Sequence, residues 1–129
     1  MKYTVFFSFL ILLSSCGNDP TQVVKQLETE VIAIHDEVMP KTNDIHKLKK
    51  ELKNRLEDTQ DSTAIFDLIK ELDNADEFMM VWMDQYQKVD MTKDTSENMS
   101  YLRDQKVKII EVKEAMLNSI KHTEEYLKN

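Results

Sequence analysis

The chain has 129 residues, 41% of them hydrophobic and 32% charged, and its formal net charge is −7 at pH 7. This acidic balance, with no basic stripe, argues against binding to nucleic-acid phosphates and to anionic lipid surfaces. The single glycine and two prolines also argue against strand-rich folds and against the glycine-rich phosphate loops of many enzymes. The composition therefore predicts an all-α protein.

The N-terminal segment has the layout of a bacterial lipoprotein signal. Lys2 precedes an apolar run from Val5 to Leu13, and two serines separate that run from Cys16. The run is too short to cross a bilayer as a helix, and an aliphatic residue, two small residues and a cysteine form the lipobox pattern. We expect residues 1–15 to be a signal peptide and Cys16 to carry the lipid anchor. A plain signal peptide and a retained anchor are the alternatives.

Cys16 is the only cysteine, so the remaining chain has no disulfide and no second thiol for catalysis or metal binding. After a lipidated tether at residues 16–21, we expect residues 22–129 to form one domain. Its predicted architecture is an elongated antiparallel three-helix bundle, up-down-up, because the connections between the apolar stripes are short.

The first predicted helix has Thr21 as its cap and reaches about Leu56. Its apolar residues recur in steps of three and four, as in a coiled coil: Val24, Leu27, Val31, Ile34, Val38, Ile45, Leu48 and Leu52. Pro40 cannot donate a backbone hydrogen bond, so we expect a kink near Met39. The stripe keeps its phase across Pro40, which favours one kinked helix over two separate ones.

The second predicted helix follows a cap at Asp61 or Ser62 and carries Ile65, Leu68, Leu72, Ala75, Met79, Trp82 and Tyr86 on one side. A connection from Val89 to Thr95 leads to the third helix, for which Asp94 is a candidate cap with Glu97 three residues on. The apolar residues assigned to the third helix are Leu102, Ile109, Ile110, Met116, Leu117, Ile120 and Leu127, with Lys106 and Lys113 between them.

Six consecutive apolar residues, 78–83, interrupt the amphipathic pattern of the second helix. Antiparallel pairing around Gln60 places them level with Pro40. One interpretation is that Trp82 and the methionines fill the irregular core at the kink. Another is that Phe78, Met80, Val81 and Trp82 form an interface for a second copy or another envelope protein.

A third interpretation is a small-ligand or soft-metal site for Cu(I) or Ag(I), since thioethers suit soft ions. It would draw on Trp82 and the methionines Met79, Met80, Met83, Met91 and Met99. No resident metal or other cofactor is expected otherwise, because His35 and His46 lie about 16 Å apart along a helix. No constellation of hydrolase or di-iron residues is present, so the chain is not expected to be an enzyme.

Several segments resemble a group of small Bacteroidota lipoproteins often labelled "viral A-type inclusion protein". They run from His35 to Lys41, which is the most specific part, from Ile45 to Leu52, from Met80 to Met83, and from Lys106 to Ile110. The resemblance covers most of the chain after the signal and implies location and fold, but no activity. The residues after Cys16 contain no acidic run of the kind described for surface export in such lipoproteins. We therefore expect an outer-membrane anchor facing the periplasm.

Overall fold

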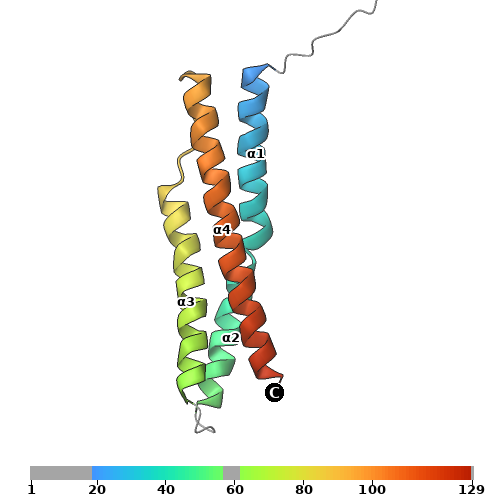
Figure 1. Ribbon diagram of the computed structural model, residues 1–129, viewed down its shortest axis with the longest axis vertical. Coiled ribbons are helices and arrows are strands. Elements are labelled where there is room, and N and C mark those ends of the chain that lie inside the picture. Colours follow the sequence, from blue (N-terminus) through green and yellow to red (C-terminus); the bar gives the residue numbers. More distant parts are fainter. Residues whose placement is uncertain (1–18, 57–61, 129) are drawn as a thin grey trace, which may run out of the picture.

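The computed structural model describes residues 19–56 and 62–128. Its helices are α1 (Pro20–Val38), α2 (Lys41–Arg55), α3 (Ser62–Gln85) and α4 (Thr95–Leu127). α1 and α2 form one arm that is bent at residues 39–40, and this arm packs with α3 and α4 into an elongated three-helix bundle (Figure 1). The predicted all-α bundle is confirmed. The predicted signal peptide, Cys16 and the candidate cap Asp61 lie outside the described residues.

Pro40 bends the first arm without ending it. Met39 (φ −53°, ψ −40°) and Pro40 (φ −61°, ψ −20°) both keep right-handed helical angles. The backbone then tightens, since Thr42 N–H donates to the Met39 carbonyl and Asn43 N–H donates to the Pro40 carbonyl, both at 3.2 Å. These three-residue steps accommodate a residue that lacks an N–H group. The kink predicted near Met39 is therefore present.

The buried side of the first arm keeps a seven-residue period straight through the bend. Its most buried residues, none more than 1% exposed, are Val24, Val31, Val38, Ile45 and Leu52. α3 follows the same period with Ile65, Leu72 and Met79, each 0% exposed. A strict seven-residue repeat keeps one seam turned toward the neighbouring helices, as in coiled coils. The predicted stripes of the first two arms are thus the core.

The predicted stripe of α4 is wrong at two positions. Ile110 and Leu117 are 37% and 39% exposed, whereas Val112, which the prediction omitted, is fully buried. The buried side of α4 consists of Asn98, Leu102, Gln105, Ile109, Val112, Met116, Ser119, Ile120 and Thr123. Four of these residues are polar, so the apolar pattern alone left them out and placed Ile110 and Leu117 in the core.

The caps show one correction and one confirmation. α1 begins at Pro20 rather than after Thr21, and the Asp19 carboxylate accepts a hydrogen bond from the Thr21 N–H at 3.0 Å. Proline suits the first helical position because its missing N–H has no partner there. The helical domain therefore starts before residue 22. At α4, Asp94 accepts from the Ser96 and Glu97 N–H groups, as predicted.

Ion pairs across the bundle fix its register. His46 Nε2 lies 3.2 Å from Asp76 Oδ2, and Lys49 pairs with Asp73, so α2 and α3 are antiparallel. The residue numbers of each of these pairs add up to about 120, which is the predicted register of neighbours joined by a short loop. The parallel neighbours α1 and α4 are joined at two levels, by Lys106–Glu30 at 2.8 Å and Lys113–Glu37 at 2.6 Å.

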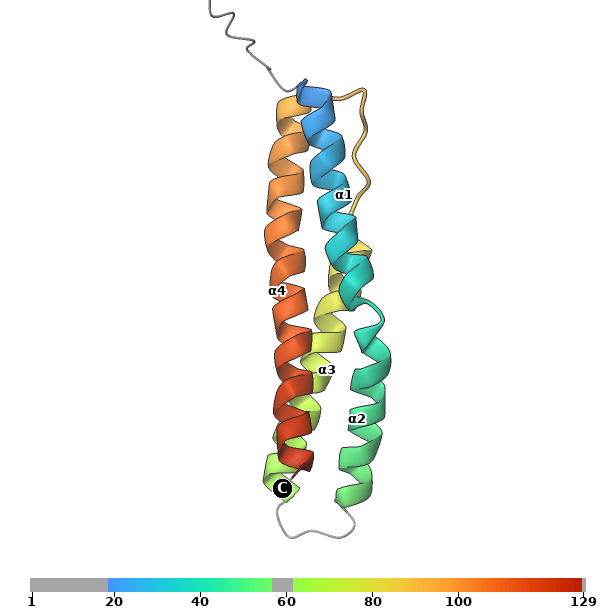
Figure 2. The ribbon, with the colours of Figure 1, turned by 90° about the vertical axis from the view of Figure 1, so that its right-hand side faces the viewer.

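α3 has 24 residues and α4 has 33, so α3 ends before α4 and before the arm of α1 and α2, and the two ends of the bundle differ. Along the bundle axis, α1 and α4 extend beyond the end of α3 at Gln85. Residues 86–94 run beside them up to the start of α4 (Figure 2). This connection is tied to α4 by two hydrogen bonds. The Gln87 N–H donates to the Tyr101 hydroxyl at 2.7 Å, and the Asn98 amide donates to the Asp90 carbonyl at 2.9 Å. At this end of the bundle, the non-helical residues 86–94 therefore take the position that α3 occupies at the other end.

Candidate functional site

The four residues of the predicted interface do not share one surface. Trp82 is only 5% exposed and belongs to the core, so it contributes no direct contact surface. Phe78, Met80 and Val81 are exposed by 38%, 54% and 43%. Residues two apart on a helix point roughly 200° around its axis from one another, so Phe78 and Met80 lie on opposite flanks of α3. Val81 lies on the outward ridge between them, and together they form the outer face of α3.

The two flanks of this face border different helices. Phe78 lines a shallow hollow with Ala115, Asn118 and His122 of α4. Met80 follows, at helical spacing, the residues Asp73 and Asp76 that pair with α2. The run is therefore divided between core and surface, and the interface interpretation stays a prediction for its exposed members. Met79 and Trp82 fill the core at the bend, while Phe78, Met80 and Val81 remain on the surface.

A second row of exposed apolar residues follows the outer side of α4. Val107, Ile110 and Leu117 are exposed by 57%, 37% and 39%. Spacings of three and seven residues place them on one side of the helix. Because Ile110 and Leu117 were assigned to the core, sequence reasoning missed this surface. This surface would have been predicted if the buried side of α4 had been chosen to include Gln105 and Ser119.

An aromatic stack occupies the level of the bend. The His35 ring lies on Trp82 with centroids 5.6 Å apart, and Trp82 lies on Tyr86 at 5.0 Å. Tyr86 in turn contacts Tyr101 of α4 at 6.3 Å. The stack links α1, the end of α3 and α4, which explains why large aromatic residues gather where α3 stops. Such ring pairs contribute beyond the burial of their area.

Polar atoms within this stack are buried without protein partners. The Trp82 Nε1 and the Tyr86 hydroxyl form no hydrogen bond in the described part of the chain. Burial raises the pKa of Tyr86 to about 12, and the nearby negative charge of Glu28 acts in the same direction. A phenol that resists ionisation is a poor proton donor at neutral pH, so Tyr86 is unsuited to act as a catalytic acid or base.

The methionines named for a soft-metal site are scattered. Met79 is in the core, Met80 and Met91 are exposed, and Met99 is half-buried near the start of α4. Only Met83 meets another metal-binding side chain, since its Sδ lies 3.3 Å from His35 Nε2. His35 Nδ1 also lies 2.9 Å from the Asp36 carboxylate. The contact of His35 with Met83 was missed from the sequence, where a metal site at His35 was considered only together with His46. The antiparallel register would have placed these two residues level.

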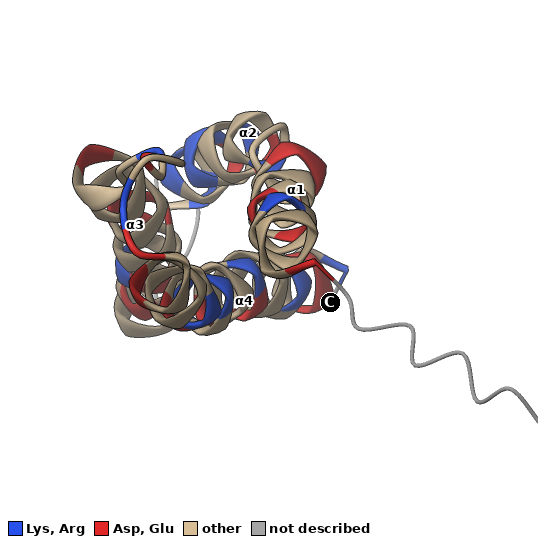
Figure 3. Cartoon of the chain, turned by 90° about the horizontal axis from the view of Figure 1, so that it is seen from above, with Lys and Arg blue, Asp and Glu red and all other residues tan. Residues whose placement is uncertain are grey.

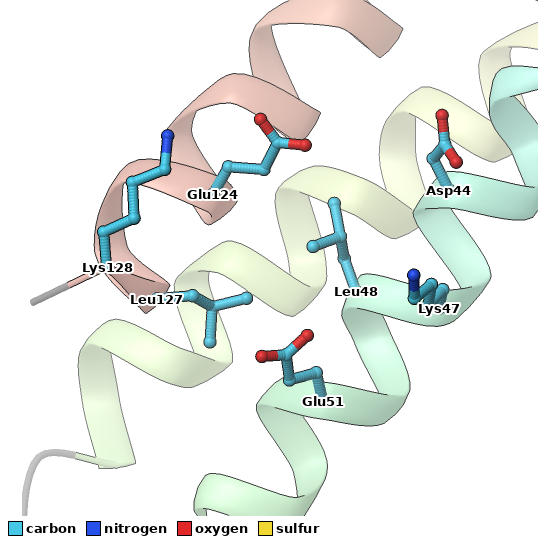
Figure 4. A pocket seen from close by; sticks show the side chains of 7 residues that line it. All are labelled: Asp44, Lys47, Leu48, Glu51, Glu124, Leu127 and Lys128. Atoms are coloured by element: carbon cyan, nitrogen blue, oxygen red, sulfur yellow. The ribbon is translucent and has the colours of Figure 1, made fainter.

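The hollow lined by Asp44, Lys47, Leu48, Glu51, Glu124, Leu127 and Lys128 lies between α2 and the end of α4 and has a volume of about 480 Å³ (Figure 4). The carboxylates of Asp44, Glu51 and Glu124 do not converge, and the two leucines lie between them (Figure 4). Within residues 19–56 and 62–128, no group of three or more His, Cys, Asp or Glu side chains could hold a metal ion. This hollow therefore offers no recognisable reactive centre.

Lysine, arginine, aspartate and glutamate residues occur along all four helices, as the view along the bundle shows (Figure 3). α3 is the most acidic of them, because it carries six acidic residues and a single lysine, Lys70. Asp73, Asp76 and Glu71 are paired with residues of α2 and α4. Asp67, Glu77 and Asp84 form no ion pair within the described helices. The outer face of α3 is therefore apolar and acidic.

None of the described helices combines the length and apolar character needed to cross a membrane. Comparison with protein-family models, with curated proteins and with solved structures found no match to this chain.

Proposed function

We propose that this chain is a lipid-anchored helical lipoprotein of the bacterial cell envelope, attached to the outer membrane and facing the periplasm. It acts without catalysis, by contact with another protein. The lipobox that ends at Cys16 and the resemblance to small Bacteroidota lipoproteins support the location. Three exposed apolar side chains on the outer face of α3, Phe78, Met80 and Val81, are the main support for a protein contact.

The charge of α3 favours a different protein over a second copy of the chain. Two copies that met through this face would bring acidic residues such as Asp67, Glu77 and Asp84 toward one another. Like charges at an interface oppose association and select against the wrong partner. The partner is therefore an envelope protein whose surface combines apolar residues with lysine or arginine.

The anchor is tested by Cys16→Ser. The parent chain should enter the membrane fraction and show the mass of a diacylglyceryl adduct, because two or three acyl chains hold a protein firmly. The variant should lack the adduct and leave the washed outer-membrane fraction. A variant that stays in that fraction would show that something other than the lipid on Cys16 holds the chain.

The contact is tested with a photoreactive residue at Val81, between Phe78 and Met80. Irradiation of intact cells should give one dominant adduct to another protein, identified by mass spectrometry. Asn54 is the matched control, since it is exposed and uncharged on α2, and a photoreactive residue there should give no such adduct.

A photoreactive residue at Leu117 separates the two apolar surfaces. An adduct at Leu117 without one at Val81 would place the contact on α4 and contradict the assignment to α3. A dimer of the chain cross-linked through Val81 would contradict the preference for a basic partner.

A further inference from the structure

The contact between His35 and Met83 brings together a ring nitrogen and a sulfur that can each donate an electron pair. His35 Nδ1 lies 2.9 Å from the Asp36 carboxylate, which only accepts hydrogen bonds, so the ring proton belongs on Nδ1. In the neutral ring, Nε2 then carries a lone pair, and it faces the Met83 sulfur at 3.3 Å. A thioether sulfur has lone pairs and no proton. Two electron-pair donors therefore face each other.

Such a pair is stabilised when a cation binds to both atoms. Imidazole and thioether are ligands that suit Cu(I) and similar soft ions, whereas Mg²⁺ and Ca²⁺ prefer oxygen. Metal–nitrogen and metal–sulfur bonds of about 2.0 and 2.3 Å in zinc sites add up to roughly 4.3 Å. The observed 3.3 Å is shorter, so one ion can bind both atoms at a bent angle and keep one side open for a third ligand.

The surroundings supply the remaining parts of a metal site. Met39 lies one helical turn beyond His35, and both line an open hollow of about 510 Å³ at the bend. This hollow opens His35 and Met39 to solvent, and Met39 adds a second thioether to its wall. Asp36 fixes the ring orientation in the way that carboxylates commonly orient metal-binding histidines. Trp82 covers one face of the ring at 5.6 Å.

We propose that His35 Nε2 and Met83 Sδ bind one Cu(I) or Ag(I) ion at the helix bend, with Met39, one helical turn beyond His35, as a third donor. The site joins α1 to the end of α3. It differs from the sequence-based soft-metal hypothesis, because it depends on His35 and Met83 and not on Met79, Met80, Met91 or Met99.

The test is a titration of the full chain in detergent with Ag(I) nitrate, in chloride-free buffer and with Cys16→Ser so that the single thiol does not compete. Trp82 is the only tryptophan, so its fluorescence reports on this site alone. One ion should bind per chain and quench Trp82. Nitrogen NMR should show His35 Nε2 unprotonated in the free chain and shifted on binding.

Two variants remove one donor each and preserve the packing. Met83→Leu conserves volume, and His35→Phe keeps an aromatic ring on Trp82. Each should weaken Ag(I) binding by about tenfold or more, since even the loss of an outer partner of a metal ligand commonly costs that much. Circular dichroism should show both variants folded. Met80→Leu and Met91→Leu are matched controls on exposed methionines and should leave affinity unchanged.

Several results would overturn the metal site. They are an absence of Ag(I) binding, unchanged affinity in Met83→Leu, or loss of binding only in the Met80 and Met91 controls. A His35 ring protonated on both nitrogens at pH 7 and unaffected by Ag(I) would also overturn it, because an imidazolium satisfies Asp36 and Met83 without a metal. Cross-linking at Val81 does not depend on His35 or Met83, so the two proposals fail independently.

Discussion

The two ends of the bundle are built differently, although the same helices α1–α2 and α4 pass through both. At the end formed by α2, α3 and the second half of α4, three helices enclose a continuous apolar core that begins at the level of Val31 and Ile109. At the other end, α1 and α4 pack with the non-helical connection 86–94. Val24 and Leu102 are fully buried there but lie outside that continuous core.

The difference shows how a short third helix changes what the remaining helices must bury. Beyond Gln85 no apolar stripe of α3 is present, and α4 instead buries Asn98 and Gln105. Asn98 holds the Asp90 carbonyl of the connection, which satisfies a backbone group that a helix would have satisfied itself. We expect this end to open more readily, because regions with fewer buried apolar contacts have lower local stability.

The largest expected effect compares one leucine from each end. Leu72 and Leu102 are both 0% exposed. Substitution of a buried leucine by alanine costs roughly 2–5 kcal/mol of unfolding free energy, with the higher values where the cavity cannot collapse. Leu72→Ala, between three helices, should lie near the top of this range and Leu102→Ala near the bottom. Urea unfolding followed by circular dichroism measures both. Equal losses would show that the connection is as rigid as a helix.

A smaller effect concerns the cap of α4 at the weaker end. Hydrogen bonds from the Ser96 hydroxyl and from backbone N–H groups hold the pKa of Asp94 below its ordinary value of 3.8. Its contribution to stability is therefore present above the pKa of the unfolded chain and is lost as pH falls through the folded pKa. Asp94→Ala should lower the urea midpoint at pH 7, and the difference from the parent chain should shrink below about pH 4.

Asp44→Ala is the control for the Asp94 substitution, since Asp44 is an acidic residue in the first turn of α2 that forms no cap. Its effect on the urea midpoint at pH 7 should be smaller than that of Asp94→Ala. If the urea midpoints of Asp94→Ala and the parent chain differed by the same amount at every pH, a role for the Asp94 carboxylate would be contradicted.

The smallest expected effect is at the boundary between the two ends. Tyr86→Phe removes a buried hydroxyl that has no partner in the described chain, so stability at pH 7 should be unchanged or slightly higher. Because the folded pKa of Tyr86 is raised to about 12, the unfolded chain ionises first, and the parent loses stability as pH rises from about 10 to 12. The variant should lack this alkaline component. A clear loss of stability at pH 7 would indicate that the hydroxyl has a partner.

The amino-acid sequence alone determined the helical class, the bend at Pro40 and the buried stripes of the first two arms. These features follow from local rules: the seven-residue period of Val24 to Leu52, the missing N–H of proline and the scarcity of glycine. The register between the arms was also predictable, because a short loop between antiparallel helices leaves little freedom in how they align.

Only the tertiary structure decided which residues share a surface. Gln105 and Ser119 are polar yet buried, so hydrophobicity alone identified only part of the core side of α4, and Ile110 and Leu117 were placed inside in error. The contact of His35 with Met83 depends on helix rotation, since 100° about an axis moves a side chain from core to solvent. Packing among the three helices sets that rotation, so it cannot be deduced from individual sequence positions.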